Sequence, residues 1–258
     1  MIKLRYLLFI YIFLFLACKK EQLLYTDNSK TIKLDLKGYI MTDTLEFIKG
    51  EKVIFTGIDA FRTSILLSLS NNDKIKIRKK TDKKIINEFT ISQEPFSQVK
   101  KFFYDGNTLA DNIELTKVSD TTNMGFRMRF ATTHKDFYGG PVDIELFIYL
   151  YDQITNEYSY TSLQTIQNVT GSFSKFIELP PLISTDTITK LYLFKVYKAG
   201  TKELPYNVEI PDPEYNYGYL DNYSAGSTQL LSISPVFNSD TGQIVSGYGI
   251  VDFSAPFK

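Results

Sequence analysis

Apolar and polar residues alternate along much of the chain. In "TIKLDLKGYI", Ile32, Leu34 and Leu36 fall on one face, while lysine and aspartate side chains fall on the other. A period of two residues is typical of a strand that packs one face on a core and turns the other to water. Gly, Asn and Asp separate these runs, and no helical pattern of ten or more residues lies between them. The pattern predicts an all-β protein.

Two groups of predicted strands are separated by a polar stretch, "KVSDTTNMG" at 117–125. The runs after this stretch are longer than those before it. We therefore predict two β-sandwich domains, over 32–118 and 122–258. The predicted strands cover 32–40, 44–48, 52–56, 64–69, 74–80, 84–91, 99–104, 112–117, 125–132, 141–152, 157–166, 172–179, 189–199, 228–235 and 243–253.

The first residues form an export signal. Lys3 and Arg5 precede an uncharged apolar stretch from Tyr6 to Ala17. A membrane-spanning helix needs about 20 apolar residues, so a stretch of this length is too short to be one. A positive segment followed by a short apolar one is typical of a secretory signal peptide. We predict that residues 1–17 are removed.

The residues around Cys18 resemble the bacterial lipobox. Leu16 and Ala17 precede the cysteine, and Phe15 stands where leucine is usual. The resemblance implies that Cys18 becomes the N-terminus and carries lipid, so that the partner of this end is a membrane. One acyl chain anchors a protein only marginally, and two or three hold it firmly. The polar residues after it make 18–31 a lipidated N-terminus and tether.

The amino-acid composition limits the kinds of catalytic and binding site that the chain can form. Cys18 is the only cysteine, so we expect no disulfide, no cysteine nucleophile and no thiolate metal site. Loss of Lys3 and Arg5 leaves 27 basic and 29 acidic residues. This balance lacks the positive charge of a nucleic-acid-binding protein. We expect no cofactor and no metal.

A basic run, "KIKIRKKTDKK" at 74–84, concentrates positive charge in the first half. Its cationic side chains alternate with Ile75 and Ile77, which is the pattern of a strand with a solvated face. The alternative is a surface patch that meets anionic lipid headgroups or polysaccharide.

Four motifs of the second half resemble a domain family of unknown function found in secreted and surface bacterial proteins. They are "FRMRF" at 126–130, "GGPVDIEL" at 139–146, "SFSKFIELPP" at 172–181 and "YLFKVYKAGTKELPY" at 192–206. The match covers about 122–210, and Lys198 stands where the family usually has proline. The resemblance implies an immunoglobulin-like sandwich and no known activity. Within it, Asp143 is expected to cap a neighbouring turn rather than to catalyse.

Together with the lipobox and "CKKE", these motifs make the chain similar to lipoproteins of Bacteroidetes bacteria. That resemblance implies a lipid-anchored protein of the outer membrane, at the cell surface or on the periplasmic face. It also draws attention to three D-T-x triplets, which resemble the O-glycosylation pattern of these bacteria. The candidate acceptors are Thr44, Thr121 and Thr187.

One tyrosine-rich segment, "VEIPDPEYNYGYLDNYSAG" at 208–226, is the candidate ligand-binding site. Its tyrosines are Tyr215, Tyr217, Tyr219 and Tyr223. The first three alternate, so they would share one face of an extended chain. Such a face could stack on sugar rings or join a protein partner, because tyrosine offers a large contact area at low entropic cost. The alternatives are a lid over the end of the sandwich, and Ca²⁺ binding by the neighbouring acids.

Catalytic motifs are lacking. His134 is the only histidine, and no G-x-S-x-G elbow marks a nucleophilic serine. A pair of carboxylates could hydrolyse glycosides, but such a pair cannot be found from sequence among 29 acidic residues. We therefore expect a non-catalytic envelope lipoprotein that presents β-sandwich domains for adhesion or ligand capture, with a glycan or a surface protein as partner. The alternative is a glycan-processing accessory protein or hydrolase.

Overall fold

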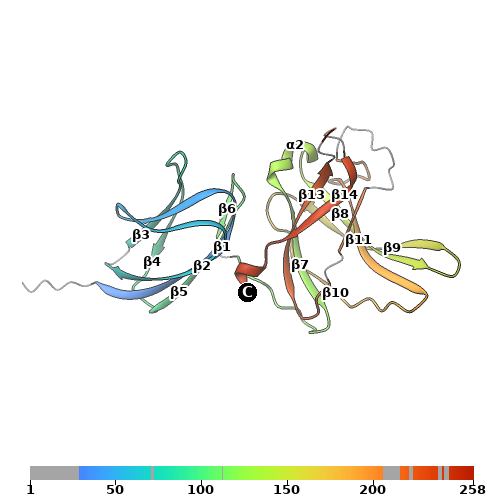
Figure 1. The fold of residues 1–258 in the computed structure, drawn as a ribbon, viewed down its shortest axis with the longest axis horizontal. Coiled ribbons are helices and arrows are strands. Elements are labelled where there is room, and N and C mark those ends of the chain that lie inside the picture. The colour runs from blue at the N-terminus through green and yellow to red at the C-terminus, as the bar shows by residue number, and fades with distance from the viewer. Residues whose placement is uncertain are drawn as a thin grey trace, which may run out of the picture.

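A computed structural model describes residues 29–70, 73–111, 113–205, 216–220, 223–237, 240 and 244–258. The predicted signal at 1–17, Cys18, nearly all of the tether at 18–31, and Tyr215 lie outside these residues. Strands dominate the described residues (Figure 1), and the all-β prediction is confirmed. The helical elements among them are one turn long: η1 (Thr132–His134), α2 (Lys135–Tyr138) and η3 (Ala255–Phe257).

The N-terminal unit is a single six-stranded sheet in the order β4-β3-β1-β5-β6, with β2 paired to β1. β1 pairs in parallel with β5, and the other neighbours are antiparallel. Its strands are β1 (Lys30–Lys49), β2 (Lys52–Leu69), β3 (Asp73–Lys79), β4 (Ile85–Ile91), β5 (Ser97–Tyr104) and β6 (Leu109–Asp111).

Strand β1 joins two of the predicted strands into one. Its pairing with β2 shifts between Ile40 and Leu45, and Asp43 there has a positive φ of 78°. The first half of β1 then pairs with β5 and the second half with β3, so the sheet folds around one core. That core takes the alternating positions Ile32, Leu34 and Leu36, which are fully buried as predicted.

The C-terminal unit is a sandwich of two four-stranded sheets, ordered β10-β7-β13-β14 and β12-β11-β8-β9. Its core lies between them and includes Phe126, Met128, Ile144 and Phe194. The strands are β7 (Met124–Phe130), β8 (Val142–Asp152), β9 (Glu157–Val169), β10 (Ile177–Leu179), β11 (Ile188–Lys198), β12 (Tyr217–Tyr219), β13 (Thr228–Phe237) and β14 (Ile244–Asp252).

Asp143 ties together two segments that lie far apart in the sequence. Its carboxylate accepts the backbone N–H of Asn168 and that of Gly200, each at 2.9 Å. Both residues have positive φ, so the carboxylate holds a bulge in β9 and the turn after β11. Asp143 caps backbone turns as expected, and the "PVD" and "AGT" motifs meet at this point because β8 pairs with β11.

The predicted strand at 112–117 is not a strand over 113–117. Pairing with β5 ends at β6, and residues 113–118 then cross from one unit to the other without forming a strand. Its apolar residues Ile113 and Leu115 instead enter a third apolar cluster between the two units. We call its buried members the junction core: Phe103, Ile113, Leu230, Phe253 and Phe257.

A buried ion pair crosses the same junction. Arg129 of β7 donates to the Asp105 carboxylate at 2.5 Å, and the two residues are 2% and 1% exposed. Asp105 also accepts the backbone N–H groups of Asn107 and Thr108. Burial alone would raise the pKa of Asp105, but these hydrogen bonds and the guanidinium together lower it. The guanidinium lies 4.7 Å from the centre of the Phe103 ring, so its flat side is also covered.

The last residues of the chain contact both units. Element η3 follows β14 and lies between the units (Figure 1). Arg62 of β2 donates to the carbonyl of Pro256 at 3.3 Å and to that of Lys258. Lys101 of β5 donates to the carbonyl of Phe257 at 3.4 Å. The junction core, the ion pair and these hydrogen bonds connect the two units.

The carboxylate of Glu178 orders the segment that leads into β7. It accepts the backbone N–H of Ser119 at 3.0 Å and that of Asp120 at 3.2 Å. The Ser119 hydroxyl and the Asn123 amide also donate to it, each at 2.8 Å. Donors from Ser119 and Asn123 lower the pKa of Glu178 to about 2.

Stability should therefore depend on Glu178 in acid. Because its pKa is about 2 in the folded protein and near 4.5 ordinarily, its contribution is complete above pH 4.5 and is lost as the pH falls towards 2. We expect the urea midpoint of Glu178→Gln to lie below that of the wild type at pH 6 and to approach it by pH 2. Glu51→Gln, at an exposed turn, is the control. A difference that stays constant with pH would contradict this role.

Candidate functional site

Aromatic side chains gather on the outer face of the β12-β11-β8-β9 sheet. We call this group the aromatic face: Phe147 and Tyr149 of β8, Tyr158 and Tyr160 of β9, and Tyr217 and Tyr219 of β12. Tyr158 is 53% exposed, Tyr160 41% and Tyr219 40%. The β8–β9 hairpin and the later strand β12 thus supply one surface.

The alternation of β8 dictates which residues reach this face. Val142, Ile144 and Leu146 are fully buried in the sandwich core, so the residues between them point outward. Continuing the period of two places Phe147 and Tyr149 on the outer side. The antiparallel pairing then sets Tyr160 opposite Tyr149.

Strand β12 extends the face across β11. Tyr219 pairs with Leu193 and Tyr217 with Lys195, while Leu193 pairs on its other side with Phe147. Leu193 points outward but is fully buried, so its neighbours on this face cover it. The aromatic face is therefore a packed layer with an exposed outer side.

Two residues fix β12 in this position. The side-chain amide of Asn216 is buried, donates to the carbonyl of Val196 at 2.9 Å and accepts from the Tyr248 hydroxyl at 3.0 Å. Gly218 lies between the two tyrosines and faces inward, where a Cβ would stand 2.4 Å from the Phe194 ring. Only glycine lets β12 lie this close to the core, so the sequence Tyr-Gly-Tyr places both rings outward.

The rings contact one another in tilted and edge-on arrangements. Ring centres are 5.4 Å apart for Tyr149 and Tyr160, 5.8 Å for Tyr158 and Tyr160, and 5.1 Å for Tyr217 and Tyr219. Aromatic pairs favour such geometry at separations of about 4.5–7 Å. Mutual packing restricts the side-chain torsions of these rings. Binding a ligand therefore costs less conformational entropy than it would with freely rotating side chains.

The aromatic face carries little charge. Burial, followed by neighbouring tyrosines, raises the pKa of Tyr149 and of Tyr219, so their hydroxyls stay neutral. The ammonium of Lys195 lies 5.4 Å from the Tyr160 ring centre and 5.9 Å from that of Phe147. At the edge, Glu145 accepts from Ser162 at 2.8 Å and from Lys202 at 2.5 Å. One cation and several neutral hydroxyls are thus available to a ligand.

The structure divides the predicted tyrosine site. Tyr217 and Tyr219 share one face, as their spacing predicts, but Tyr223 lies elsewhere. Its hydroxyl donates to the carbonyls of Thr122 and Leu179, and its ring packs against the sandwich core. Tyr223 therefore has the position of a lid, whereas the two tyrosines of β12 belong to the outer face.

Four members of the aromatic face escaped the sequence analysis. Phe147, Tyr149, Tyr158 and Tyr160 lie in "LFIYLYD" and "EYSYTS", which were interpreted only as strands. The signal was present, because aromatic residues recur there at every second position. Alternation within a strand shows that they share a face, but it does not show that β12 adds two more rings beside them.

The other candidate residues lie apart from the aromatic face. Thr121 and Thr187 are exposed in turns, while Thr44 is half-buried in β1, and glycosylation of all three stays a prediction. His134 packs on Phe237, with ring centres 5.5 Å apart. Among the described residues, no three His, Cys, Asp or Glu side chains gather as metal ligands.

The basic run lies mostly on β3, and much of its charge is paired. Ile75 and Ile77 are buried, as the alternation predicts. Lys74 pairs with Glu88 at 2.7 Å and Arg78 with Glu46 at 2.6 Å. These ion pairs favour a solvated strand face over an anion-binding patch.

No protein-family model matches the chain, and no curated protein matches it. Among solved structures, the chain is similar to a candidate adhesin from Bacteroides ovatus, with 12% identity and a TM-score of 0.22. The match covers 86% of this chain and 93% of that one. At this TM-score the similarity carries no argument. In the described part of the chain, no helix has the length and apolar character needed to cross a membrane.

Proposed function

We propose that the protein is a non-catalytic, lipid-anchored protein of the outer membrane that captures a ligand on its aromatic face. The observation that carries this proposal is the gathering of six aromatic side chains on one outer sheet surface. Exposed aromatic side chains that gather on one face are typical of interaction sites.

Sugar rings are the ligand class that this surface fits best. A pyranose has a flat side of C–H groups that can lie on an aromatic ring, while its hydroxyls need hydrogen-bond partners. The hydroxyls of Tyr158 and Tyr219 and the ammonium of Lys195 offer such partners beside the rings. Tyrosine supplies this combination at low entropic cost because only two side-chain torsions are fixed.

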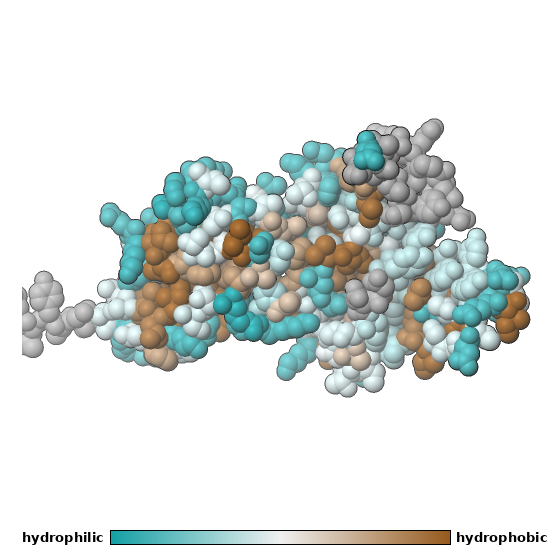
Figure 2. All heavy atoms as spheres, in the orientation of Figure 1, coloured by the Kyte–Doolittle hydropathy of each residue, from teal (hydrophilic) through white to brown (hydrophobic). Residues whose placement is uncertain are grey.

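We expect the aromatic face to lie away from the predicted anchor. In Figure 1, β1 begins at one end of the molecule and the β8–β9 hairpin lies at the opposite end. Figure 2 shows hydrophobic residues at that far end, where Ile154 in the hairpin turn is 74% exposed. Lipid on Cys18 would fix the first end to the membrane. Palmitate labelling that disappears in Cys18→Ala tests the anchor.

A hydrolase would need two carboxylates free to act on a bond, about 5–10 Å apart. Beside the aromatic face, the carboxylate of Glu145 is engaged by Ser162 and Lys202, and that of Asp143 by two backbone N–H groups. This engagement favours binding over hydrolysis as the proposed function.

A glycan array probed with the full chain in detergent tests both possibilities. We expect retention of specific neutral polysaccharides, released again without cleavage. Chromatography of the released material distinguishes capture from hydrolysis. Shortened products would favour the hydrolase, and retention of no glycan would contradict ligand capture of this class.

A further inference from the structure

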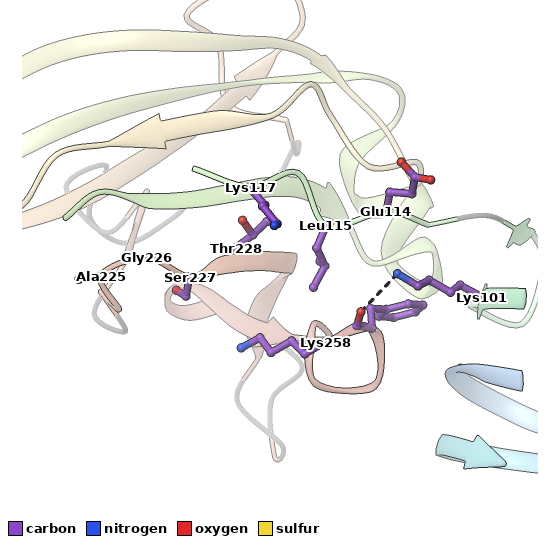
Figure 3. Close-up of a pocket in the computed structure, with 10 residues that line it drawn as sticks. Lys101, Glu114, Leu115, Lys117, Ala225, Gly226, Ser227, Thr228 and Lys258 are labelled. Atoms are coloured by element: carbon purple, nitrogen blue, oxygen red, sulfur yellow. Dashed lines mark hydrogen bonds between the residues drawn. The ribbon is translucent and has the colours of Figure 1, made fainter. Parts of the chain in front are cut away.

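A second concave site lies at the junction of the two units, away from the aromatic face. Its volume is about 600 Å³, and it is open to solvent. Glu114, Leu115 and Lys117 form one wall, residues 225–228 form another, and Phe257 and Lys258 form a third (Figure 3). Lys101 reaches it from β5. Clefts between domains are common ligand sites, because each domain can supply part of the contact surface.

The lining of this junction cleft is positively charged. Lys101, Lys117 and Lys258 supply three ammonium groups, and Glu114 supplies the one side-chain carboxylate among the lining residues. In Figure 3 the side chain of Glu114 points away from Lys117 and Lys258. The side chains that line the cleft therefore have a net charge of +2, and the carboxylate of Glu114 lies to one side.

Two of these ammonium groups lack an acceptor. Lys101 donates to the carbonyl of Phe257 at 3.4 Å, but no described residue accepts from the side chain of Lys117 or Lys258. Some lysines elsewhere are paired with carboxylates, as Lys30 is with Glu94, and Lys202 with Glu145. Here three lysines line one hollow, and no carboxylate is paired with them among the described residues. Such an arrangement is stabilised by a bound anion.

We propose that the junction cleft binds a tetrahedral oxyanion, the chemistry shared by inorganic phosphate or sulfate and by their esters on sugars. The negative charge of such a group offsets the positive side-chain charge of the lining. Lysine binds such groups as a flexible point charge. Leu115 and the Phe257 ring add apolar surface on which the carbon skeleton of an ester can lie. The site is independent of the aromatic face.

Isothermal titration of the full chain in detergent with sodium sulfate, sodium phosphate and a sugar sulfate tests this inference. We expect saturable binding that weakens about tenfold in Lys117→Met and again in Lys258→Met, because each change removes one charge-assisted contact. Methionine keeps the apolar stem of lysine. Glu114→Gln should tighten binding, and Lys135→Met, on the exposed α2, should leave it unchanged.

The three probes also identify the source of the anion. Tighter binding of the sugar sulfate than of inorganic sulfate, with the unsulfated sugar inactive, assigns the site to an ester. Equal binding assigns it to the free ion. Absence of saturable binding to all three probes, or equal affinity of the wild type and the Lys117→Met/Lys258→Met variant, would overturn the proposal.

Discussion

Replacing Asp105 by alanine is expected to lower the free energy of unfolding by about 3–5 kcal/mol, because Arg129 then stays buried without a counter-charge. Arg129 is 2% exposed and cannot reach water without moving the two units apart. The change also removes the acceptor of the Asn107 and Thr108 N–H groups. For a chain of this size the loss corresponds to a fall in Tm of roughly 6–20 °C.

Three variants separate this effect from general damage. Asp111→Ala removes an exposed carboxylate nearby and should change stability by less than about 0.5 kcal/mol. The Asp105→Leu/Arg129→Met pair should recover much of the loss, because apolar residues often replace a buried ion pair without penalty. Urea unfolding measures all of them. A loss below about 1 kcal/mol for Asp105→Ala would contradict the role given to the pair.

Truncating Phe253 is expected to uncouple the two units. Its ring centre lies 4.5 Å from that of Tyr39 and 5.3 Å from that of Phe103, so it joins β1 and β5 to the C-terminal unit. A buried Phe→Ala change costs about 3–5 kcal/mol through lost burial and the cavity left behind. We expect one calorimetric transition for the wild type and two for Phe253→Ala, because the units then melt separately.

Phe96→Ala is the matched control for this experiment. Phe96 is 57% exposed in the N-terminal unit, so its loss removes a phenyl ring without opening the junction core. Its melt should keep one transition at nearly the wild-type temperature. Two transitions in the wild type would show that the units fold independently and that the junction core does not couple them.

The fold was largely predictable because alternation is a local property. The burial of Ile32, Leu34 and Leu36 followed directly from their spacing, and so did that of Ile75 and Ile77. The sequence could not show that 32–40 and 44–48 continue as one strand. That outcome depends on the long partner β2, which pairs on both sides of the irregularity.

The junction could not be predicted, because its partners are distant in sequence. Arg127 and Arg129 occupy equivalent outward positions in "FRMRF", and their pattern alone predicts that both are exposed. Arg129 is buried because the N-terminal unit covers that part of β7. Asp105 lies in the sequence "YDGNT", which is typical of a turn, and its carboxylate caps that turn. Its hydrogen bond to the guanidinium of Arg129, 24 residues away in the sequence, cannot be predicted from the residues around Asp105.

The candidate site was predicted only in part, because it too is assembled from residues that are distant in sequence. The spacing of Tyr217 and Tyr219 gave their common face, whereas the order of strands in the sheet decides which rings lie beside them. Tyr149 and Tyr160 become neighbours through the β8–β9 hairpin, and β11 lies between them and β12. Pairing between strands must be known before such a surface can be assembled.

The central claim is that the aromatic face binds a ligand without being needed for the fold. The most direct test is array binding and a thermal melt on the same sample of Tyr158→Ala/Tyr160→Ala/Tyr219→Ala. Its control is Ile58→Ala/Leu66→Ala/Phe96→Ala, which removes three exposed apolar side chains of the N-terminal unit. We expect the tyrosine variant to lose glycan retention while it still unfolds cooperatively from a folded state, whereas the control keeps glycan retention. Full retention by the tyrosine variant would contradict the claim.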